Sequence, residues 1–355
     1  MGDAVPAHER LAAWRIVDAN ANRAAEGLRV VEEYCRFLLN DAHLTRQYKQ
    51  LRHDLTDALQ LFPPAILAAA RETTSDVGTT VTVAQEGQRD SLLAVALASG
   101  KRVEQALRVL EEFSKALCLP SAGRFEELRY RAYTLAKSWT LAGDSLQRLA
   151  DARLYVLVDG CESEIAFERL VRSLVAAGVS ILQLRDKRLA DRTLLQRARQ
   201  LRAAAPRGGG TLVVVNDRPD LAVLSDADGV HVGQDELTVR EVRQIVGPTM
   251  LVGVSTHRIE QARQAALDGA SYLGCGPVFP SETKSFDRFP GLEYLRQVVA
   301  EVRLPAFAIG GITQTNLPEV LATGFSRVAV SGSITKAPDA DKEARLMLQR
   351  LAEKL

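Results

Sequence analysis

The sequence lacks any apolar segment that is long enough to span a membrane. No apolar run approaches the roughly 18 residues that a membrane-spanning helix requires, and the charged N-terminus contains no signal-peptide core. An excess of charge of either sign is also missing, because 45 Lys and Arg residues face 44 Asp and Glu residues. This balance argues against a nucleic acid or a membrane surface as the main partner. We therefore expect a cytoplasmic protein.

Cysteine is scarce, and its positions exclude two kinds of stabilising site. The four cysteines, at positions 35, 118, 161 and 275, form no C-x-x-C pair and have no histidine at metal-ligand spacing. The pattern therefore indicates neither a zinc site nor a disulfide framework, and we expect reduced, mostly buried thiols. No arrangement of Ser, His and Asp, or of Cys and His, indicates a covalent nucleophile.

Residues 1–149 have the pattern of an all-helical domain, with apolar residues at spacings of three and four. Within this domain the segment RAAEGLRVVEEY at 23–34 returns as RVEQALRVLEEF at 102–113, and a second helical stretch follows each copy. The repeat predicts two similar helical hairpins. The residues expected in their core are Leu28, Val31, Leu107 and Leu110.

Two features of this half have both an ordinary and a functional interpretation. Arg29 with Glu32, and Arg108 with Glu111, stand three residues apart, which suits surface ion pairs as well as a site. The segment RETTSDVGTTV at 71–81 offers hydroxyl and backbone donors to a phosphate, but it has no P-loop pattern and also suits a plain loop. Both alternatives stay open for each feature.

After residue 149 the pattern changes to short apolar runs that alternate with helical stretches. The runs are 153–158, 179–184, 211–215, 229–232, 251–254, 272–275, 306–309 and 327–330. Eight strand-helix units in about 200 residues match a (β/α)8 barrel, whereas a doubly wound open sheet usually has fewer strands. The sequence therefore predicts an α/β fold, namely a TIM barrel over residues 150–355, preceded by the all-α domain of two repeated hairpins.

Polar residues follow seven of these runs, most abruptly where LVVVNDR at 212–218 ends a buried strand. Taken alone, the polar end of this run is explained equally well by a turn that caps a following helix. Ligands of a barrel, however, gather at the carboxyl ends of its strands. Asp217 and Glu236 carry hard oxygen ligands suited to Mg²⁺, and three cations suit a diphosphate, namely Arg185, Lys187 and Lys284. His231 lies within a run and is expected to be a packed histidine.

A second phosphate position is predicted after the last two strands. Backbone N–H groups hold a phosphate there in many barrels. The residues concerned are Gly310, Gly311, Ser331 and Gly332. The glycine pair is also compatible with an ordinary tight turn.

These residues stand in motifs that resemble the thiamine phosphate synthase family over the whole second half. The motifs are QLRDK at 183–187, ND at 216–217, DGVHVGQDE at 228–236, GVS at 253–255, GPVFPSETK at 276–284, GGI at 310–312 and SGSI at 331–334. The resemblance implies a transferase that joins hydroxymethylpyrimidine diphosphate to a thiazole phosphate with magnesium. Thiamine phosphate and diphosphate would be the products.

The resemblance also implies a role for each matching residue. Contacts to the pyrimidine diphosphate would come from Gln183, Leu184, Arg185, Asp186, Lys187, Asn216, Ser255 and Lys284. The thiazole phosphate would be held by Ser281, Thr283, Gly311, Ser331 and Gly332, with Glu282 in the same substrate-binding loop. Asp217 and Glu236 would bind magnesium, and Arg185, Lys187 and Lys284 would stabilise the leaving diphosphate, so that no general base is required.

Two positions depart from the family pattern. The family usually has Gln-Glu-Asp or Gln-Asp-Asp where this chain has Gln234-Asp235-Glu236, so the second metal ligand is either the longer Glu236 or Asp235. Ser281 replaces the usual threonine and keeps its hydroxyl group.

The helical half resembles a small domain often fused to this synthase and associated with phosphorylation of hydroxymethylpyrimidine phosphate. The likeness rests on DANANRAAEGLR at 18–29 and DVGT at 76–79, and it implies ATP as a further substrate. A purely structural role is the alternative for this half. For the barrel the alternatives are a thiazole tautomerase, which has no need of the diphosphate-binding residues, and a non-catalytic binder of thiamine precursors.

Overall fold

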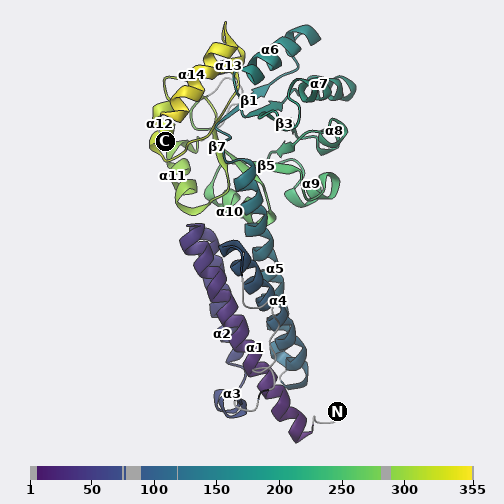
Figure 1. Cartoon of the computed structure of the whole chain (residues 1–355), viewed down its shortest axis with the longest axis vertical. Coiled ribbons are helices and arrows are strands. Elements are labelled where there is room, and N and C mark those ends of the chain that lie inside the picture. Colours follow the sequence, from purple (N-terminus) through teal and green to yellow (C-terminus); the bar gives the residue numbers. More distant parts are fainter. Residues whose placement is uncertain (1–5, 74–75, 77–88, 118, 281–288, 354–355) are drawn as a thin grey trace. The chain divides into compact units, whose positions relative to one another are not determined.

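The computed structural model describes residues 6–73, 76, 89–117, 119–280 and 289–353. The chain divides into two compact units, residues 1–139 and 140–355. The division falls inside helix α5 (Leu119–Arg148), whereas the sequence pattern placed the boundary at the end of that helix (Figure 1). In the part of the chain described, no helix is both long and apolar enough to cross a membrane.

In the residues that the structure describes, unit 1 is all-helical, as predicted. Its elements are α1 (Ala7–Glu33), a π-helical turn η1 (Tyr34–Leu38), α2 (Ala42–Leu59), α3 (Pro64–Ala70), α4 (Leu92–Leu117) and the first part of α5. The repeated segments lie on α1 and α4, which pack closely because Gly27 has no side chain: a Cβ there would lie 2.7 Å from Val103 Cγ2. The four predicted core residues on these two helices are all completely buried, which confirms their assignment.

The repeated glutamates are not the surface residues that their spacing allowed. Glu32 is only 3% exposed, and its carboxylate accepts hydrogen bonds from Arg29 on the same helix and from Arg52 on α2. The Arg52 Nε to Glu32 Oε2 distance is 2.9 Å. In this hairpin the first helix, α1, is therefore tied to the second helix, α2, through a buried carboxylate.

The second hairpin repeats this arrangement. Glu111 on α4 is 4% exposed and accepts from Arg108 at 2.8 Å and from Arg129 Nε on α5 at 2.8 Å. Arg108 itself is half exposed, so the expectation of a surface pair is correct for the arginine and wrong for the glutamate. The charge on each glutamate is therefore held in the core by an arginine from another helix.

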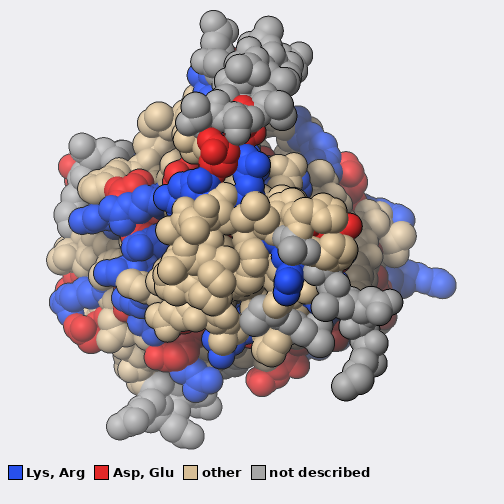
Figure 2. Space-filling view, turned by 90° about the horizontal axis from the view of Figure 1, so that it is seen from below, with Lys and Arg blue, Asp and Glu red and all other residues tan. Residues whose placement is uncertain are grey.

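Figure 2 shows basic and acidic side chains interspersed around an uncharged area of the face that it presents. This mixture agrees with the balanced composition of the chain. Of the cysteines that the structure describes, Cys35 and Cys275 are buried, Cys161 is partly buried, and all three are free thiols. Cys118 lies outside the described residues.

Unit 2 is a closed barrel of eight parallel strands in sequence order, which confirms the predicted architecture. The strands are β1 (Leu154–Val158), β2 (Ile181–Leu184), β3 (Leu212–Asn216), β4 (Gly229–Val232), β5 (Leu251–Thr256), β6 (Tyr272–Cys275), β7 (Ala306–Ile309) and β8 (Val328–Val330). The helices between and after them are α6 (Glu164–Ala176), α7 (Asp191–Ala204), α8 (Pro219–Leu224), α9 (Val239–Val246), α10 (Ile259–Asp268), α11 (Gly291–Glu301), α12 (Leu317–Ala322), α13 (Gly332–Thr335) and α14 (Ala340–Ala352) (Figure 1).

Side chains alternate between the two faces of each strand and so form two cores. The outward residues of β1, such as Leu154 and Val156, pack against the helices. Inward residues fill the barrel, where Tyr155, Tyr272 and Phe307 meet in edge-to-face or tilted ring contacts. Side chains therefore fill the barrel below its mouth, and a ligand can bind only at the ends of the strands.

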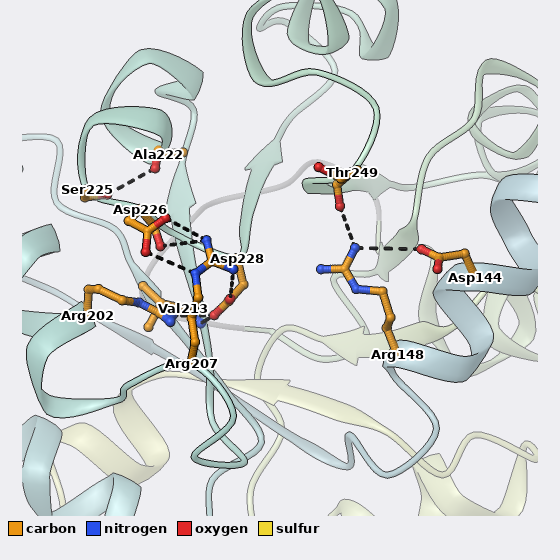
Figure 3. A network of polar contacts seen from close by, with 10 residues as sticks. All are labelled: Asp144, Arg148, Arg202, Arg207, Val213, Ala222, Ser225, Asp226, Asp228 and Thr249. Carbon is orange, nitrogen blue, oxygen red and sulfur yellow. Dashed lines mark hydrogen bonds and ion pairs between the residues drawn. The ribbon is translucent and has the colours of Figure 1, made fainter.

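Polar contacts support the opposite end of the barrel, where the strands begin. Asp228, just before β4, pairs with Arg202 and, at 3.2 Å, with Arg207 (Figure 3). At the end of α5, Arg148 donates to the carbonyl oxygen of Thr249, just before β5, at 2.5 Å (Figure 3). These contacts fix the amino ends of neighbouring strands. In a TIM barrel that end contributes to stability, and the carboxyl end carries the chemistry.

Candidate functional site

Two carboxylates and one ammonium group meet at the carboxyl ends of β2, β3 and β4. Lys187 Nζ lies 3.4 Å from Asp217 Oδ2 and 3.6 Å from Glu236 Oε1. Burial and the neighbouring Glu236 carboxylate raise the pKa of Asp217, and the Lys187 ammonium offsets this only in part. The two negative charges therefore converge on one point that a cation stabilises.

The backbone around the carboxylates is shaped to bring them together. Asp217 has φ of 60°, in the left-handed region that Asp and Asn tolerate better than most residues. The Asn216 amide donates to Asp217 Oδ2 at 2.7 Å, and the Asp217 N–H donates to the carbonyl oxygen of His231 at 2.8 Å. A Cβ at Gly233 would collide with the Glu236 carboxylate, so the glycine leaves room for that side chain.

The donor set suits magnesium better than a softer metal. Within the described residues no group of three or more His, Cys, Asp or Glu side chains forms a metal cage. Magnesium is commonly bound by one or two carboxylates and completes its shell with water and substrate phosphates. Asp217 and Glu236 supply such a pair. Asp235 is exposed and has no hydrogen bond or ion pair to any described residue, so the geometry favours Glu236 as the second ligand.

The cationic residues after β2 differ in their surroundings. The Arg185 side chain is partly buried and makes no hydrogen bond or ion pair with any residue that the structure describes, so its guanidinium is available to an anionic ligand. Lys187 is largely exposed above the two carboxylates. Lys284 and the neighbouring Ser281, Glu282 and Thr283 lie outside the described residues.

Asp186 stands in the same motif but is engaged elsewhere. Its carboxylate accepts from the Gly160 N–H at 3.2 Å, from the Arg188 N–H at 2.8 Å, and from the Arg188 guanidinium. Burial alone would raise the pKa of Asp186, but the Arg188 and Gly160 donors lower it to about 2. These contacts join the loops after β1 and β2. They give Asp186 a role in ordering the loops beside Arg185.

Successive side chains of β2 point alternately into the barrel and toward the surrounding helices. Gln183 points into the barrel, where its amide donates to Tyr155 Oη at 2.6 Å. Leu184 points outward and is completely buried among the residues that pack the sheet against its helices. Only the main chain of Leu184 therefore borders the mouth.

His231 is packed inside the barrel, as its position in a strand predicted. Its Nε2 lies 2.9 Å from Ser255 Oγ and its Nδ1 lies 3.3 Å from Tyr272 Oη. Burial, and secondarily the charge of Arg185, lower the pKa of His231 to about 4, so the imidazole is neutral near pH 7. The Ser255 carbonyl oxygen accepts from the Gln234 amide at 2.6 Å.

The turn after β7 is built from two glycines with positive φ, 102° at Gly310 and 65° at Gly311. A Cβ at Gly311 would lie 2.5 Å from the carbonyl oxygen of Pro280, so only glycine fits beneath the loop after β6. Ser331 Oγ donates to the carbonyl oxygen of Leu157 at 3.0 Å, and Gly332 begins α13. Their backbone N–H groups occupy the position where many barrels hold a phosphate.

Sequence reasoning missed Tyr155 and Tyr272, which lie inside the barrel beneath these side chains. The available signal was a tyrosine at an inward position of an otherwise apolar strand. A second signal was glycine at the neighbouring inward positions Gly253 and Gly274, where a large ring needs space.

Comparisons with known proteins place this geometry in context. A family model described as thiamine monophosphate synthase matches residues 154–334, and a model of the ThiD2 family matches residues 15–138. A thiamine-phosphate synthase of Rhodopirellula baltica is 47% identical over 330 residues, covering 90% of this chain and 88% of the relative. A thiamine-phosphate synthase of Gloeobacter violaceus is 42% identical, covering 95% of this chain and 96% of the relative. Among solved structures, thiamine phosphate pyrophosphorylase from Pyrococcus furiosus matches with a TM-score of 0.52 and 33% identity, covering 57% of this chain and 97% of the other.

Proposed function

The chain belongs to the thiamine-phosphate synthase family, whose members are transferases of thiamine biosynthesis, and we propose how its strand ends carry out the reaction. The barrel joins hydroxymethylpyrimidine diphosphate to a thiazole phosphate. The observation that carries this proposal is the pair of converging carboxylates, Asp217 and Glu236, with Lys187 between them; Arg185 precedes Lys187 by two residues after β2. Such a set offers two carboxylates to a metal ion and two cations to the oxygens of a diphosphate.

In this proposal Asp217 and Glu236 hold a magnesium ion. When bound, the metal supplies positive charge to the diphosphate oxygens. Lys187 lies between the two carboxylates and would be free to turn to the phosphate oxygens when Asp217 and Glu236 hold the ion. Arg185 adds a planar fork of donors that suits phosphate oxygens.

The reaction then depends on charge stabilisation and alignment. The bond between the pyrimidine methylene carbon and the diphosphate oxygen breaks, and its electron pair leaves with the diphosphate. Arg185, Lys187 and, by family resemblance, Lys284 stabilise that charge, while the aminopyrimidine ring delocalises the cation. The thiazole nitrogen forms the new bond to the same carbon, so no general base is needed.

The thiazole phosphate is assigned to the loops after β6, β7 and β8. Gly311, Ser331 and Gly332 supply backbone N–H groups there. By family resemblance the Ser281 and Thr283 hydroxyl groups and Glu282 contribute from the loop after β6. This position holds the second substrate opposite the diphosphate-binding residues.

The direct test is turnover of the two substrates by the full chain with magnesium. Formation of thiamine phosphate together with diphosphate is the expected result. A tautomerase-like protein would instead convert a thiazole phosphate without using the pyrimidine diphosphate. A non-catalytic binder would bind both precursors and release them unchanged.

The identity of the second metal ligand gives a sharper prediction. Glu236→Gln is expected to weaken the apparent magnesium affinity by at least about tenfold, because even the loss of a group that only supports a metal ligand typically costs this much. Asp235→Asn is the matched control, since Asp235 is exposed and lies one residue away. Its magnesium affinity should stay close to that of the unchanged chain. The opposite ranking in a magnesium titration of turnover would assign the ligand to Asp235.

For unit 1 we propose that it phosphorylates hydroxymethylpyrimidine phosphate with ATP and so supplies the diphosphate that the barrel consumes. The proposal is supported by the compact core of this unit and by the match of residues 15–138 to a family model of their own. The competing proposal is a structural role for the paired hairpins. Asp76 is described, whereas Gly78 and Thr79 of the same motif lie outside the described residues.

The two proposals for unit 1 differ in a measurable product. The full chain would receive hydroxymethylpyrimidine phosphate, ATP and magnesium without any thiazole phosphate, so that pyrimidine diphosphate accumulates if it is formed. The two halves, expressed separately, show which of them is responsible. Product from the helical half and none from the barrel is the expected result. A well-folded helical half that forms no product would leave only the structural role.

A further inference from the structure

Five polar side chains form a continuous hydrogen-bonded chain inside the barrel. Gln183 Nε2 lies 2.6 Å from Tyr155 Oη, which lies 3.1 Å from Tyr272 Oη. Tyr272 Oη lies 3.3 Å from His231 Nδ1, and His231 Nε2 lies 2.9 Å from Ser255 Oγ. The chain begins and ends with two of the side chains that the family resemblance assigns to the pyrimidine substrate.

The barrel makes room for this chain with glycine. Gly253 on β5 stands beside both rings in the strand register, paired with His231 on β4 and with Tyr272 on β6. A Cβ at Gly253 would run into the Tyr272 ring and lie 2.5 Å from His231 Nδ1. A Cβ at Gly274 would lie 3.1 Å from His231 Cε1. Inward positions that elsewhere in the barrel carry branched side chains are thus left empty for the two rings.

Each hydroxyl group in a chain of this kind donates one hydrogen bond, so the direction chosen at one end fixes the direction at the other. The Gln183 amide donates to Tyr155 Oη. Tyr155 then donates to Tyr272, Tyr272 donates to His231 Nδ1, and the proton on His231 Nε2 is donated to Ser255 Oγ. At the Gln183 end the carbonyl oxygen remains as an acceptor for a ligand, beside the second N–H of the amide. At the Ser255 end the hydroxyl proton remains to be donated.

We propose that Tyr155, Tyr272 and His231 are positioning residues that fix this hydrogen-bond polarity at the mouth of the barrel. The proposal rests on the proposed function and deepens it, since it states what the site recognises: a donor on the pyrimidine at Gln183 and an acceptor at Ser255. An aminopyrimidine supplies the N–H donor. An oxopyrimidine reverses both positions, because a carbonyl oxygen replaces the amino donor and a ring N–H replaces the neighbouring ring-nitrogen acceptor, so it is rejected.

The test measures binding, so it does not depend on turnover. The probes are two pyrimidine monophosphates that differ only in carrying an amino or an oxo group at the same ring position. In the unchanged full chain we expect the amino compound to bind about tenfold more tightly, the ratio that one hydrogen bond to a buried group supports. In Tyr272→Phe the ring still fills its space, but the chain is broken, because Tyr155 has no acceptor there and is free to donate to Gln183. The amino-to-oxo ratio should then fall toward one.

Tyr294→Phe is the matched control. Tyr294 is an equally buried tyrosine on α11, and its hydroxyl group donates to Thr256 Oγ1 at 2.6 Å on the outer face of the sheet. Its loss should affect stability while the amino-to-oxo ratio stays unchanged. Tyr155→Phe serves as a second variant if Tyr272→Phe does not fold, because it frees the Gln183 amide directly.

The outcomes separate this inference from the proposed function. An unchanged ratio in a folded Tyr272→Phe or Tyr155→Phe protein would overturn the positioning role, and so would a preference of the unchanged chain for the oxo compound. Either result leaves thiamine phosphate formation, assayed separately, as it was. Conversely, if the expected binding ratios are found but no thiamine phosphate forms, the positioning role is supported and the proposed reaction is contradicted.

Discussion

Asp217→Asn is expected to reduce thiamine phosphate formation at limiting magnesium by on the order of 10²-fold, the typical loss when one preorganised electrostatic group is removed from a site. The substitution removes the negative charge that pairs with Lys187 at 3.4 Å and that the proposed metal ion requires. Asparagine keeps the shape of the side chain and tolerates the φ of 60° at this position, so the fold should be retained. A higher magnesium concentration should recover part of the activity.

A matched control for this prediction lies three residues along the chain. Asp220 is also a carboxylate of the β3–α8 segment, but its partner is Arg218 at 2.7 Å and its side chain is about half exposed. Asp220→Asn should therefore leave magnesium dependence unchanged, because an exposed ion pair contributes little. Initial rates over a magnesium titration measure both variants. Near-normal turnover by Asp217→Asn at limiting magnesium would remove Asp217 from the proposed metal site.

The barrel could be predicted because each strand has a recognisable local sequence pattern. Strands buried on both faces read as short apolar runs, and polar residues follow where the strand ends. The run at 229–232 coincides with β4, and the run at 272–275 coincides with β6. Parallel order then brings Asp217 and Glu236 together, since the carboxyl ends of all strands face the same way. The sequence alone therefore predicts that these two carboxylates meet.

Contacts between residues far apart in the chain were not predictable in this way. Spacing revealed the pairing of Arg29 with Glu32, three residues apart, but gave no sign of Arg52, 20 residues further on. The same applies to Tyr155 and Tyr272, whose hydroxyl groups meet across 117 residues. Burial of a charge or a hydroxyl group depends on such partners, which a local pattern does not contain.

A sequence motif also does not show in which direction each of its side chains points. Gln183 and Leu184 are adjacent in the QLRDK motif, yet one faces the barrel interior and the other the helices, because side chains alternate along a strand. Asp186 shares the motif and is bound by Arg188 and Gly160 instead. The matching motif therefore locates the site, and the fold decides which of its side chains reach a ligand.

The largest stability effect is expected from Glu111→Ala in unit 1. Arg129 is only 9% exposed at its side chain, and its guanidinium lies over the rings of Tyr130 and Tyr133. Removing Glu111 leaves this buried cation without its carboxylate. Breaking a buried ion pair in this way costs about 3–5 kcal/mol. Glu32→Ala should cost less, because Arg52 is 27% exposed and keeps more of its hydration.

Tryptophan fluorescence during denaturant unfolding measures this effect in one unit only. Both tryptophans of the chain, Trp14 and Trp139, belong to unit 1, and Trp139 is buried and donates to Tyr48 Oη at 2.8 Å. Glu112→Ala is the control, because the Glu112 side chain is 42% exposed and an exposed ion pair contributes little to the unfolding free energy. Equal midpoints for Glu111→Ala and Glu112→Ala would contradict the claim. Burial of the Glu111–Arg129 pair, rather than its charge alone, makes the difference between the two neighbouring glutamates.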